Sequence, residues 1–283
     1  MSVSAGKADF ELQRCFIAAC ELDVTALKPG NVRIGHSAHG MSAQDFVDSA
    51  RACAPALCRR GASLGQRVLE AIDSTRQVVQ CNTNLGIVLL AAPLCCAAQG
   101  GVELRTTLVR QLSQLSRADA VLVYQAIRLA QPGGMGIAAK HDLATEPGVS
   151  LLEAMREADQ RDSIARQYVQ GFRDVFDVGL PQWHHALARF GDEAWAATHV
   201  YLVYLSTWTD SLIERKFGAA TAQAVSARAR ELYSQFSTYS RVNDIESQLL
   251  AWDDELRSAG LNPGTSADLT VATAFAAKLM QAV

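Results

Sequence analysis

The chain has 283 residues, of which 49% are hydrophobic, so it is long enough to bury a large core. Its formal net charge of -3 argues against a nucleic-acid partner, because a nucleic-acid-binding face needs clustered Lys and Arg. The N-terminus lacks the charged-then-apolar order of a signal peptide, and the seven cysteines contain no CxxC pair. We therefore expect a cytoplasmic protein with reduced cysteines packed in its core.

The first two elements in chain order are predicted to be helices. Apolar residues recur at helical spacing from Leu12 to Ala26, which predicts an amphipathic helix. The apolar segment from Leu85 to Ala98 contains Pro93 and is too short for a membrane span. We therefore expect it to be a buried helix, and we expect no membrane partner.

The middle of the chain is also predicted to be helical. Val121 to Tyr124 is rich in strand-forming residues, but it lies within a stripe of helical spacing, so a helix is favoured. Ser150 and Glu153 have the spacing of a capping box, which predicts a helix from Leu151 whose apolar stripe continues to Val169.

The C-terminal third completes an all-α prediction. His199 to Trp208 has no charged residue and predicts a helix that is buried on all sides. Residues 222–236 and 269–280 show helical spacing, and no segment shows sustained apolar and polar alternation. We expect a single large helical domain over residues 1–283, with a buried central helix and functional loops at helix ends.

Two loops, residues 27–41 and 80–86, combine Gly and Asn with other polar residues, and the first also contains Pro29. In the first, Lys28, Gly30 and Asn31 form either a helix stop or an anion-binding turn, and His39 follows. In the second, Asn82 and Asn84 either cap the next helix or present amides to a phosphate at its N-terminus. We predict that all six residues contact a nucleotide.

A third loop, residues 131–148, contains a G-x-G-x-x-A pattern that begins at Gly134. A helical stripe precedes the pattern, so it is not a dinucleotide-binding fingerprint, and we predict only a Gly-rich loop near a ligand. Asp142, Glu146 and Asp162 follow. Asp162 interrupts the inward stripe of its predicted helix, where it either pairs with Arg166 or binds Mg²⁺.

Charged residues also follow the apolar run that ends at Trp208. Asp210, Arg215 and Lys216 form either a solvated helix end or a site at which Asp210 binds metal or a substrate hydroxyl and the cations bind phosphate. In the fourth loop, residues 261–269, Ser266 and Asp268 either cap the last helix or form an anion site. We predict a metal site from Asp142, Glu146, Asp162 and Asp210.

Five segments in this order resemble the triphosphoribosyl-dephospho-CoA synthase family: LKPGNV, NTNLG, a Gly-rich loop, TDSLIERKFG and PGTSADL. The resemblance implies an all-α enzyme that uses ATP as a substrate. Such enzymes transfer the triphosphoribosyl group to 3′-dephospho-CoA, release adenine and so make a prosthetic-group precursor. A carboxylate, Asp210 or Asp268, would activate the acceptor hydroxyl or stabilise positive charge on the sugar, with Mg²⁺ present.

The chain departs from the better-known members at the second motif, where Asn84 and Leu85 replace His and Lys. The segment from His141 to Phe172 resembles a divergent branch found in archaea and in bacteria with tetrahydromethanopterin- or methanofuran-type cofactors. Two alternatives therefore stay open: a nucleotide-dependent step in making such a one-carbon cofactor, and a non-catalytic helical nucleotide-binding protein. A homodimer is also left open.

Overall fold

The computed structural model describes residues 3–38, 40–101, 103–132, 145–238 and 243–281. Within them the regular structure is helical, and extended pairing is limited to isolated bridges between Arg33 and His36 and between Ala38 and Met41. The all-α prediction is confirmed. The helices are α1 (Val3–Thr25), α2 (Ala43–Leu57), α3 (Leu64–Val78), α4 (Leu85–Gln99), α5 (Leu104–Leu112), α6 (Arg117–Ala130), α7 (Leu151–Ala158), α8 (Ser163–Val169), the π-helix η1 (Asp174–Gly179), α9 (Leu180–Phe190), α10 (Glu193–Thr207), α11 (Ser211–Phe217), α12 (Ala219–Thr238), α13 (Asn243–Ser258) and α14 (Gly264–Gln281).

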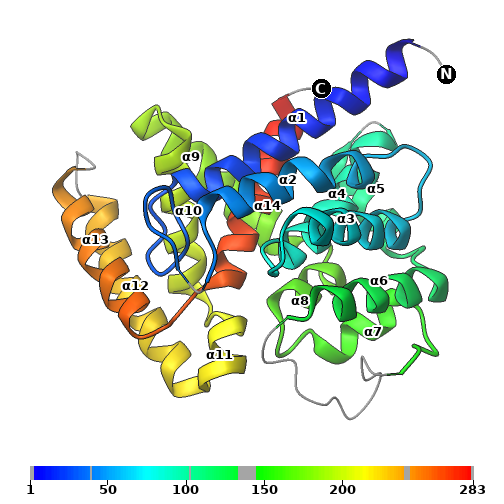
Figure 1. Ribbon diagram of the computed structural model, residues 1–283. Coiled ribbons are helices and arrows are strands. Elements are labelled where there is room, and N and C mark those ends of the chain that lie inside the picture. Colours follow the sequence, from blue (N-terminus) through cyan, green and yellow to red (C-terminus); the bar gives the residue numbers. More distant parts are fainter. Residues whose placement is uncertain (1–2, 39, 102, 133–144, 239–242, 282–283) are drawn as a thin grey trace.

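Three apolar helices, α4, α10 and α14, lie in the interior. In α10, every residue from Ala196 to Ser206 is buried, so the prediction of a helix buried on all sides is confirmed. The helix predicted over Leu85 to Ala98 is α4, and its apolar residues are buried in the same way. α14 packs against α1, α4 and α10, and Figure 1 shows it passing through the middle of the molecule.

The buried apolar residues form two clusters on either side of these central helices. The larger cluster takes residues from α1 to α6, α9, α10 and α14. The smaller one joins α10 to α12 and α13, whose Leu232 and Trp252 are buried in it. Because α10 contributes to both clusters, it connects the α12–α13 side of the molecule to the rest (Figure 1).

The continuous helix predicted from Leu151 to Val169 is wrong. The capping box of Ser150 and Glu153 is present, but α7 ends at Ala158 and α8 begins at Ser163. Asp162 has extended backbone geometry and caps α8 by accepting hydrogen bonds from Ile164 N (2.9 Å) and Ala165 N (3.1 Å). Asp favours an N-cap over a helix interior, so the residue that interrupts the stripe also marks the helix break.

All seven cysteines are free, as predicted, and five of them are buried. Burial raises the pKa of Cys53 to about 12, so this thiol stays neutral and unreactive. Among the described residues, no single helix has the length and apolar character needed to cross a membrane. Among the same residues, α4 and α5 together have that length and apolar character, but the chain bends sharply between them.

Candidate active site

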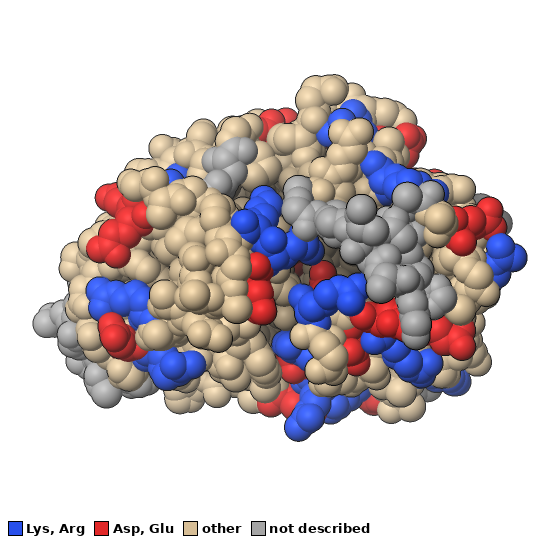
Figure 2. All heavy atoms as spheres, turned by 90° about the horizontal axis from the view of Figure 1, so that it is seen from below, with Lys and Arg blue, Asp and Glu red and all other residues tan. Residues whose placement is uncertain are grey.

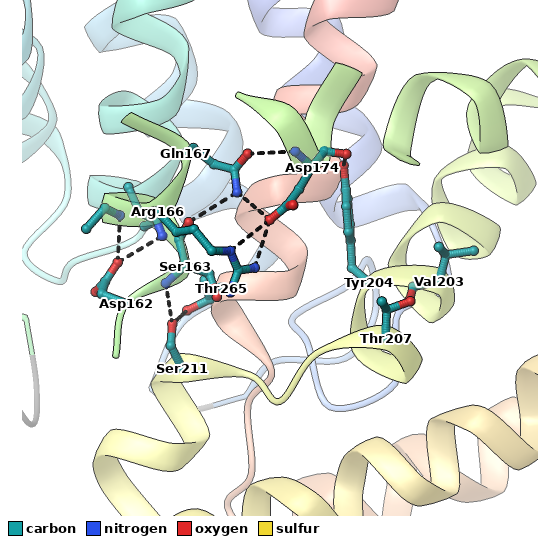
Figure 3. Close-up of polar contacts among 12 residues, drawn as sticks. Asp162, Ser163, Arg166, Gln167, Asp174, Val203, Tyr204, Thr207, Ser211 and Thr265 are labelled. Carbon is teal, nitrogen blue, oxygen red and sulfur yellow. Dashed lines mark hydrogen bonds and ion pairs between the residues drawn. The ribbon is translucent and has the colours of Figure 1, made fainter. Parts of the chain in front are cut away.

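The N-terminal ends of α4, α8, α11 and α14 meet in one place. α14 contacts α4, α8 and α11, and α4 contacts α8. Ser163 N donates to Ser211 Oγ over 3.4 Å, and Ser211 Oγ donates to Thr265 Oγ1 over 3.1 Å, which joins the first turns of three of these helices (Figure 3). Helix N-termini carry partial positive charge, so this region favours negatively charged groups.

Asp268, near the start of α14, lies against the first turn of α4. A Cβ atom on residue 86 would overlap Asp268 Oδ2 and would come within 2.9 Å of Ile164 Cδ1. Gly86 therefore leaves the space that the carboxylate occupies, and any other residue would displace it. Among the described residues, the Asp268 carboxylate forms no hydrogen bond or ion pair, although it is only partly exposed.

The surroundings of Asp268 favour its protonated form. Burial raises the pKa of Asp268 well above its usual value, and the nearby carboxylates Asp23 and Asp210 raise it further. Lys28 acts in the opposite direction but does not cancel these effects. In its ionised form, a carboxylate with a raised pKa and no partner is a stronger base than an ordinary aspartate, which suits it to accept a proton from a substrate.

Asp210 is arranged differently, since both of its carboxylate oxygens are already occupied. Oδ1 accepts from the backbone N–H groups of Leu212 (3.0 Å) and Ile213 (3.1 Å), and so caps α11. Oδ2 accepts from the N–H and the hydroxyl of Ser266, both at 2.8 Å. Asp210 thus holds the start of α11 against the start of α14, and Ser266 serves the same contact instead of facing a ligand.

The electrostatics of Asp210 fit this holding role. The residue is 2% exposed, and burial raises the pKa of its carboxyl group. The hydrogen bonds from Ser266, Ile213 and Leu212 favour the ionised form and limit that rise. The ionised form is therefore kept in place by donors of the protein itself.

Lys28 is not arranged as a phosphate-binding lysine. It is 1% exposed, and its ammonium group forms a buried ion pair with Asp23 at the end of α1. A lysine in such a pair cannot extend to a bound nucleotide unless the ion pair breaks. The prediction that Lys28 itself neutralises phosphate is not supported by this geometry.

The turn after Lys28 docks two loops together. Gly30 has a φ of +85°, and its N–H donates to Asp253 Oδ1 over 2.8 Å. Asn31 is buried, and its Nδ2 lies 3.5 Å from the carbonyl oxygen of Pro263. These polar groups therefore connect the loop of residues 27–41 to α13 and to the start of α14 instead of pointing at a ligand.

Asn82 and Asn84 have separate roles. Asn82 Oδ1 accepts from Leu85 N over 3.2 Å, which agrees with the capping alternative for this residue. Asn84 is turned into the protein, where its Nδ2 donates to Thr75 Oγ1 over 2.9 Å. Its Oδ1 is buried without a hydrogen-bond partner among the described residues.

The two predicted cations of α11 lie at the outer edge of this region. Arg215 Nη1 is 3.4 Å from Asp162 Oδ2, and both side chains are about one-quarter exposed. Lys216 is exposed and has no ion pair among the described residues. The predicted partner of Asp162, Arg166, pairs with Asp174 instead.

The predicted metal ligands are not gathered into one group. Glu146 forms an exposed ion pair with Arg117 at 2.8 Å, while Asp162 and Asp210 cap different helices. Within the part of the chain that the structure describes, no group of three or more His, Cys, Asp or Glu side chains could hold a metal ion. Three predicted site residues, His39, Gly134 and Asp142, lie outside the described residues.

Several contributors were missed in the sequence. Gly86 follows the polar residues 82–84 at a helix start, where a ligand or another side chain can approach the backbone closely. This sequence pattern could have identified Gly86 as part of the site. Asp23 and Asp253 could not be identified from the sequence, because their partners are fixed only by tertiary packing.

Figure 2 shows the surface around this region as a hollow that is bordered by Lys and Arg and contains Asp or Glu.

Comparisons with known proteins identify the family of the chain. Residues 9–283 match the family described as CitG: ATP:dephospho-CoA triphosphoribosyl transferase. The protein is therefore a transferase. More specifically, the chain belongs to the CitG family and is a triphosphoribosyl-dephospho-CoA synthase-like enzyme, as the motifs predicted.

A solved structure supports the assignment. It is a crystal structure from Archaeoglobus fulgidus whose description provisionally assigns the protein as a triphosphoribosyl-dephospho-CoA synthase. The two chains share 26% sequence identity and superpose with a TM-score of 0.63. The match covers 81% of this chain and 96% of the archaeal chain. No curated protein sequence matches the chain.

Proposed function

We propose that the enzyme transfers the triphosphoribosyl group of ATP to a hydroxyl of dephospho-CoA, with Asp268 as the catalytic carboxylate. The observation that carries this proposal is the position of Asp268. It is the carboxylate at the four helix ends that has no hydrogen bond or ion pair among the described residues. The raised pKa of Asp268 gives it the basicity that proton abstraction from a hydroxyl requires.

The reaction is a substitution at the anomeric carbon of the ATP ribose. The acceptor oxygen forms a bond to that carbon, and the bond from the carbon to the adenine nitrogen breaks with its electron pair leaving on adenine. Asp268 takes the proton of the attacking hydroxyl, and this proton balances the one that adenine gains. As positive charge builds on the sugar, the carboxylate of Asp210 near Asp268 lowers its energy, whereas the charge of Asp23 is offset by Lys28.

Mg²⁺ belongs to this proposal as a partner of the triphosphate. The described residues contain no group of three or more metal-binding side chains, so this part of the chain does not fit a resident ion. Mg²⁺ commonly keeps its waters and binds through substrate phosphates plus one or two carboxylates. Asp162, the partly exposed N-cap of α8, is the carboxylate that would complete such a shell.

The direct test is release of free adenine. The purified protein is incubated with ATP, Mg²⁺ and dephospho-CoA, and adenine is separated and quantified by liquid chromatography. We expect adenine to appear in step with a product that carries the triphosphoribosyl group, and only when the acceptor is present. Absence of adenine with dephospho-CoA and with alternative acceptors would show that this chemistry is not performed.

A second candidate keeps the nucleotide but changes the acceptor. Asn84 is turned into the protein toward Thr75 and Leu85 is buried, so this helix start offers neither the imidazole nor the ammonium group of the better-known members. The acceptor is then a precursor of a one-carbon cofactor of the pterin or furan type. Adenine release with such a precursor, and none with dephospho-CoA, would favour this candidate.

A further inference from the structure

One arginine, on one of the four helices whose N-terminal ends meet, is held rigidly, and part of its hydrogen-bonding capacity is unused among the described residues. The guanidinium of Arg166, on α8, donates from Nε (3.0 Å) and Nη2 (2.8 Å) to the same oxygen of Asp174. Its flat face lies over the ring of Trp208, with 5.1 Å between the guanidinium carbon and the ring centroid. The Nη1 group has no partner among the described residues, and the side chain is 20% exposed.

The support behind this arginine is extensive. Asp174 is buried, and the oxygen that faces Arg166 also accepts from Gln167 Nε2 over 2.6 Å. Gln167 Oε1 accepts in turn from the backbone N–H of Asp174 over 3.2 Å. Tyr204 donates to the carbonyl of Asp174 over 3.2 Å, so the π-helix that carries Asp174 is anchored to α10 (Figure 3). Arg166 therefore cannot reorient without disturbing several buried contacts.

The position of Arg166 places it beside the proposed reaction centre. On the same short helix, Ile164 lies against the space that Gly86 leaves open next to Asp268. Ser163, one turn before Arg166, is hydrogen bonded to Ser211 at the start of α11. Trp208, the residue over which Arg166 stacks, lies three residues before Ser211. Figure 3 shows Arg166 extending from α8 toward Asp174, on the same side as Ser211 of α11 and Thr265 of α14.

A triphosphate needs cations, and the predicted ones are largely committed elsewhere. Lys28 is paired with Asp23 in the interior, and Arg215 is paired with Asp162. Arg166 also has an acidic partner, but one that uses only the Nε and Nη2 side of the guanidinium. A fixed guanidinium with a free edge is well suited to phosphate oxygens, because little side-chain entropy is lost on binding.

We propose that Arg166 binds a phosphate group of the substrate through Nη1, and that Asp174 and Trp208 position it for this task. The inference rests on the proposed function only in taking the ligand to be a polyphosphate. It does not depend on which acceptor is used or on whether transfer occurs. The opposing explanation is that Arg166 and Asp174 form an ion pair that only stabilises the fold.

The chain contains a matched control for that explanation. Arg105 forms a similar pair with Asp177, with distances of 2.6 and 2.9 Å, and its guanidinium carbon lies 5.4 Å from the ring centroid of Phe176. This pair is on the surface, where both side chains are about two-fifths exposed. Arg105 therefore has the same kinds of neighbours as Arg166, but it joins α5 to η1, and neither of these is among the four helices whose N-terminal ends meet.

The experiment measures binding of inorganic tripolyphosphate by calorimetry, without any acceptor. Arg166→Met and Arg166→Lys are compared with Arg105→Met. A double variant, Arg166→Met with Asp174→Asn, guards against misfolding, because it leaves no uncompensated buried carboxylate. Circular dichroism and the melting temperature establish that each variant is folded.

We expect Arg166→Met and the double variant to bind tripolyphosphate roughly 10- to 100-fold more weakly, the usual loss for a charge-assisted hydrogen-bonding residue. Arg166→Lys should fall between them and the parent, and Arg105→Met should match the parent. Folded Arg166 variants that bind tripolyphosphate as tightly as the parent would overturn the proposal, as would failure of the parent to bind it. Neither result bears on adenine release, so this proposal and the proposed function can fail separately.

Discussion

Asp210 and Asp268 lie at the starts of neighbouring helices, and their carboxylates have opposite surroundings. Asp210 accepts four hydrogen bonds from two helices and is 2% exposed. Asp268 accepts none among the described residues, and it occupies the space that Gly86 leaves open. Burial raises the pKa of both groups, but only at Asp210 do donors of the protein offset that rise.

The difference separates a structural acid from a reactive one. A carboxylate whose lone pairs are all used must give up hydrogen bonds before it can take a proton from a substrate. A carboxylate without partners has no such cost, and its raised pKa already favours the protonated form that follows the transfer. The same contrast distinguishes Arg166 from Lys28. The Nη1 group of Arg166 has no partner among the described residues, whereas the buried Lys28 is paired with Asp23.

The largest effect on stability is expected for Asp210→Ala. This change leaves four donors of α11 and α14 without an acceptor in a buried setting, and removes the cap of α11. We expect the free energy of unfolding to fall by about 2–5 kcal/mol. Urea unfolding followed by circular dichroism measures it. A loss below about 1 kcal/mol would mean that Asp210 does not hold these two helices together.

Gly86→Ala should reduce activity more than stability. The added methyl group would overlap the Asp268 carboxylate and force it from its position. We expect kcat for adenine release to fall roughly 10- to 100-fold, because small displacements of a reacting group are costly. Gly148→Ala is the matched control, since a Cβ at that position meets no atom within 4 Å. Equal kinetics for the two variants would remove the positioning role of Gly86.

The raised pKa of Asp268 predicts a specific pH dependence of stability. The folded-state pKa lies above the unfolded value of about 4, so between the two the folded state binds more protons. The stability of the parent therefore falls as pH rises through this window, whereas Asp268→Asn does not titrate. We expect the variant to resemble the parent below about pH 4 and to be increasingly more stable toward neutral pH.

Urea unfolding of the parent and of Asp268→Asn at several pH values provides the measurement. A difference in unfolding free energy that stays constant with pH would show that the pKa of Asp268 is not raised. A parent that gains stability relative to the variant as pH rises would show that the shift has the opposite sign.

The smallest effect is expected for Asp162→Ala. Asp162 caps a seven-residue helix, as Asp210 does, but it is partly exposed and its ion pair with Arg215 spans 3.4 Å. We expect a loss of about 1 kcal/mol in unfolding free energy, mainly from the cap. A loss as large as that of Asp210→Ala would mean that burial and the contact with Ser266 do not distinguish the two acids.

Helical periodicity predicted much of the fold. The uncharged run up to Trp208 and the stripe of residues 269–280 became the central helices α10 and α14. The break between α7 and α8 was not foreseen, because the stripe continues across it and only the local capping preference of Asp162 ends the helix. Periodicity reports which face is apolar, and it does not report where a chain turns.

The candidate site was foreseen as a set of loops, with their individual roles unresolved. The sequence placed Asp210 after a buried helix and Asp268 before the last helix, and in the structure the two acids are close enough for Asp210 to raise the pKa of Asp268. Ser266 determines which acid has its oxygens occupied, because it donates to Asp210. Asp174 in the π-helix determines how Arg166 is oriented, because it accepts from one side of the guanidinium. Such partners are set by tertiary packing, so a single sequence offers no signal for them.

The rate of adenine release by Asp268→Asn tests the central claim most directly. ATP and acceptor are kept saturating, and ATP binding is measured separately so that loss of binding is not mistaken for loss of chemistry. We expect kcat to fall by roughly 10²- to 10⁴-fold, the usual contribution of a general base, while the protein stays folded and binds ATP. Asp210→Ala, assayed where it remains folded, should keep more of the parent rate. A kcat for Asp268→Asn within a few-fold of the parent would contradict the account.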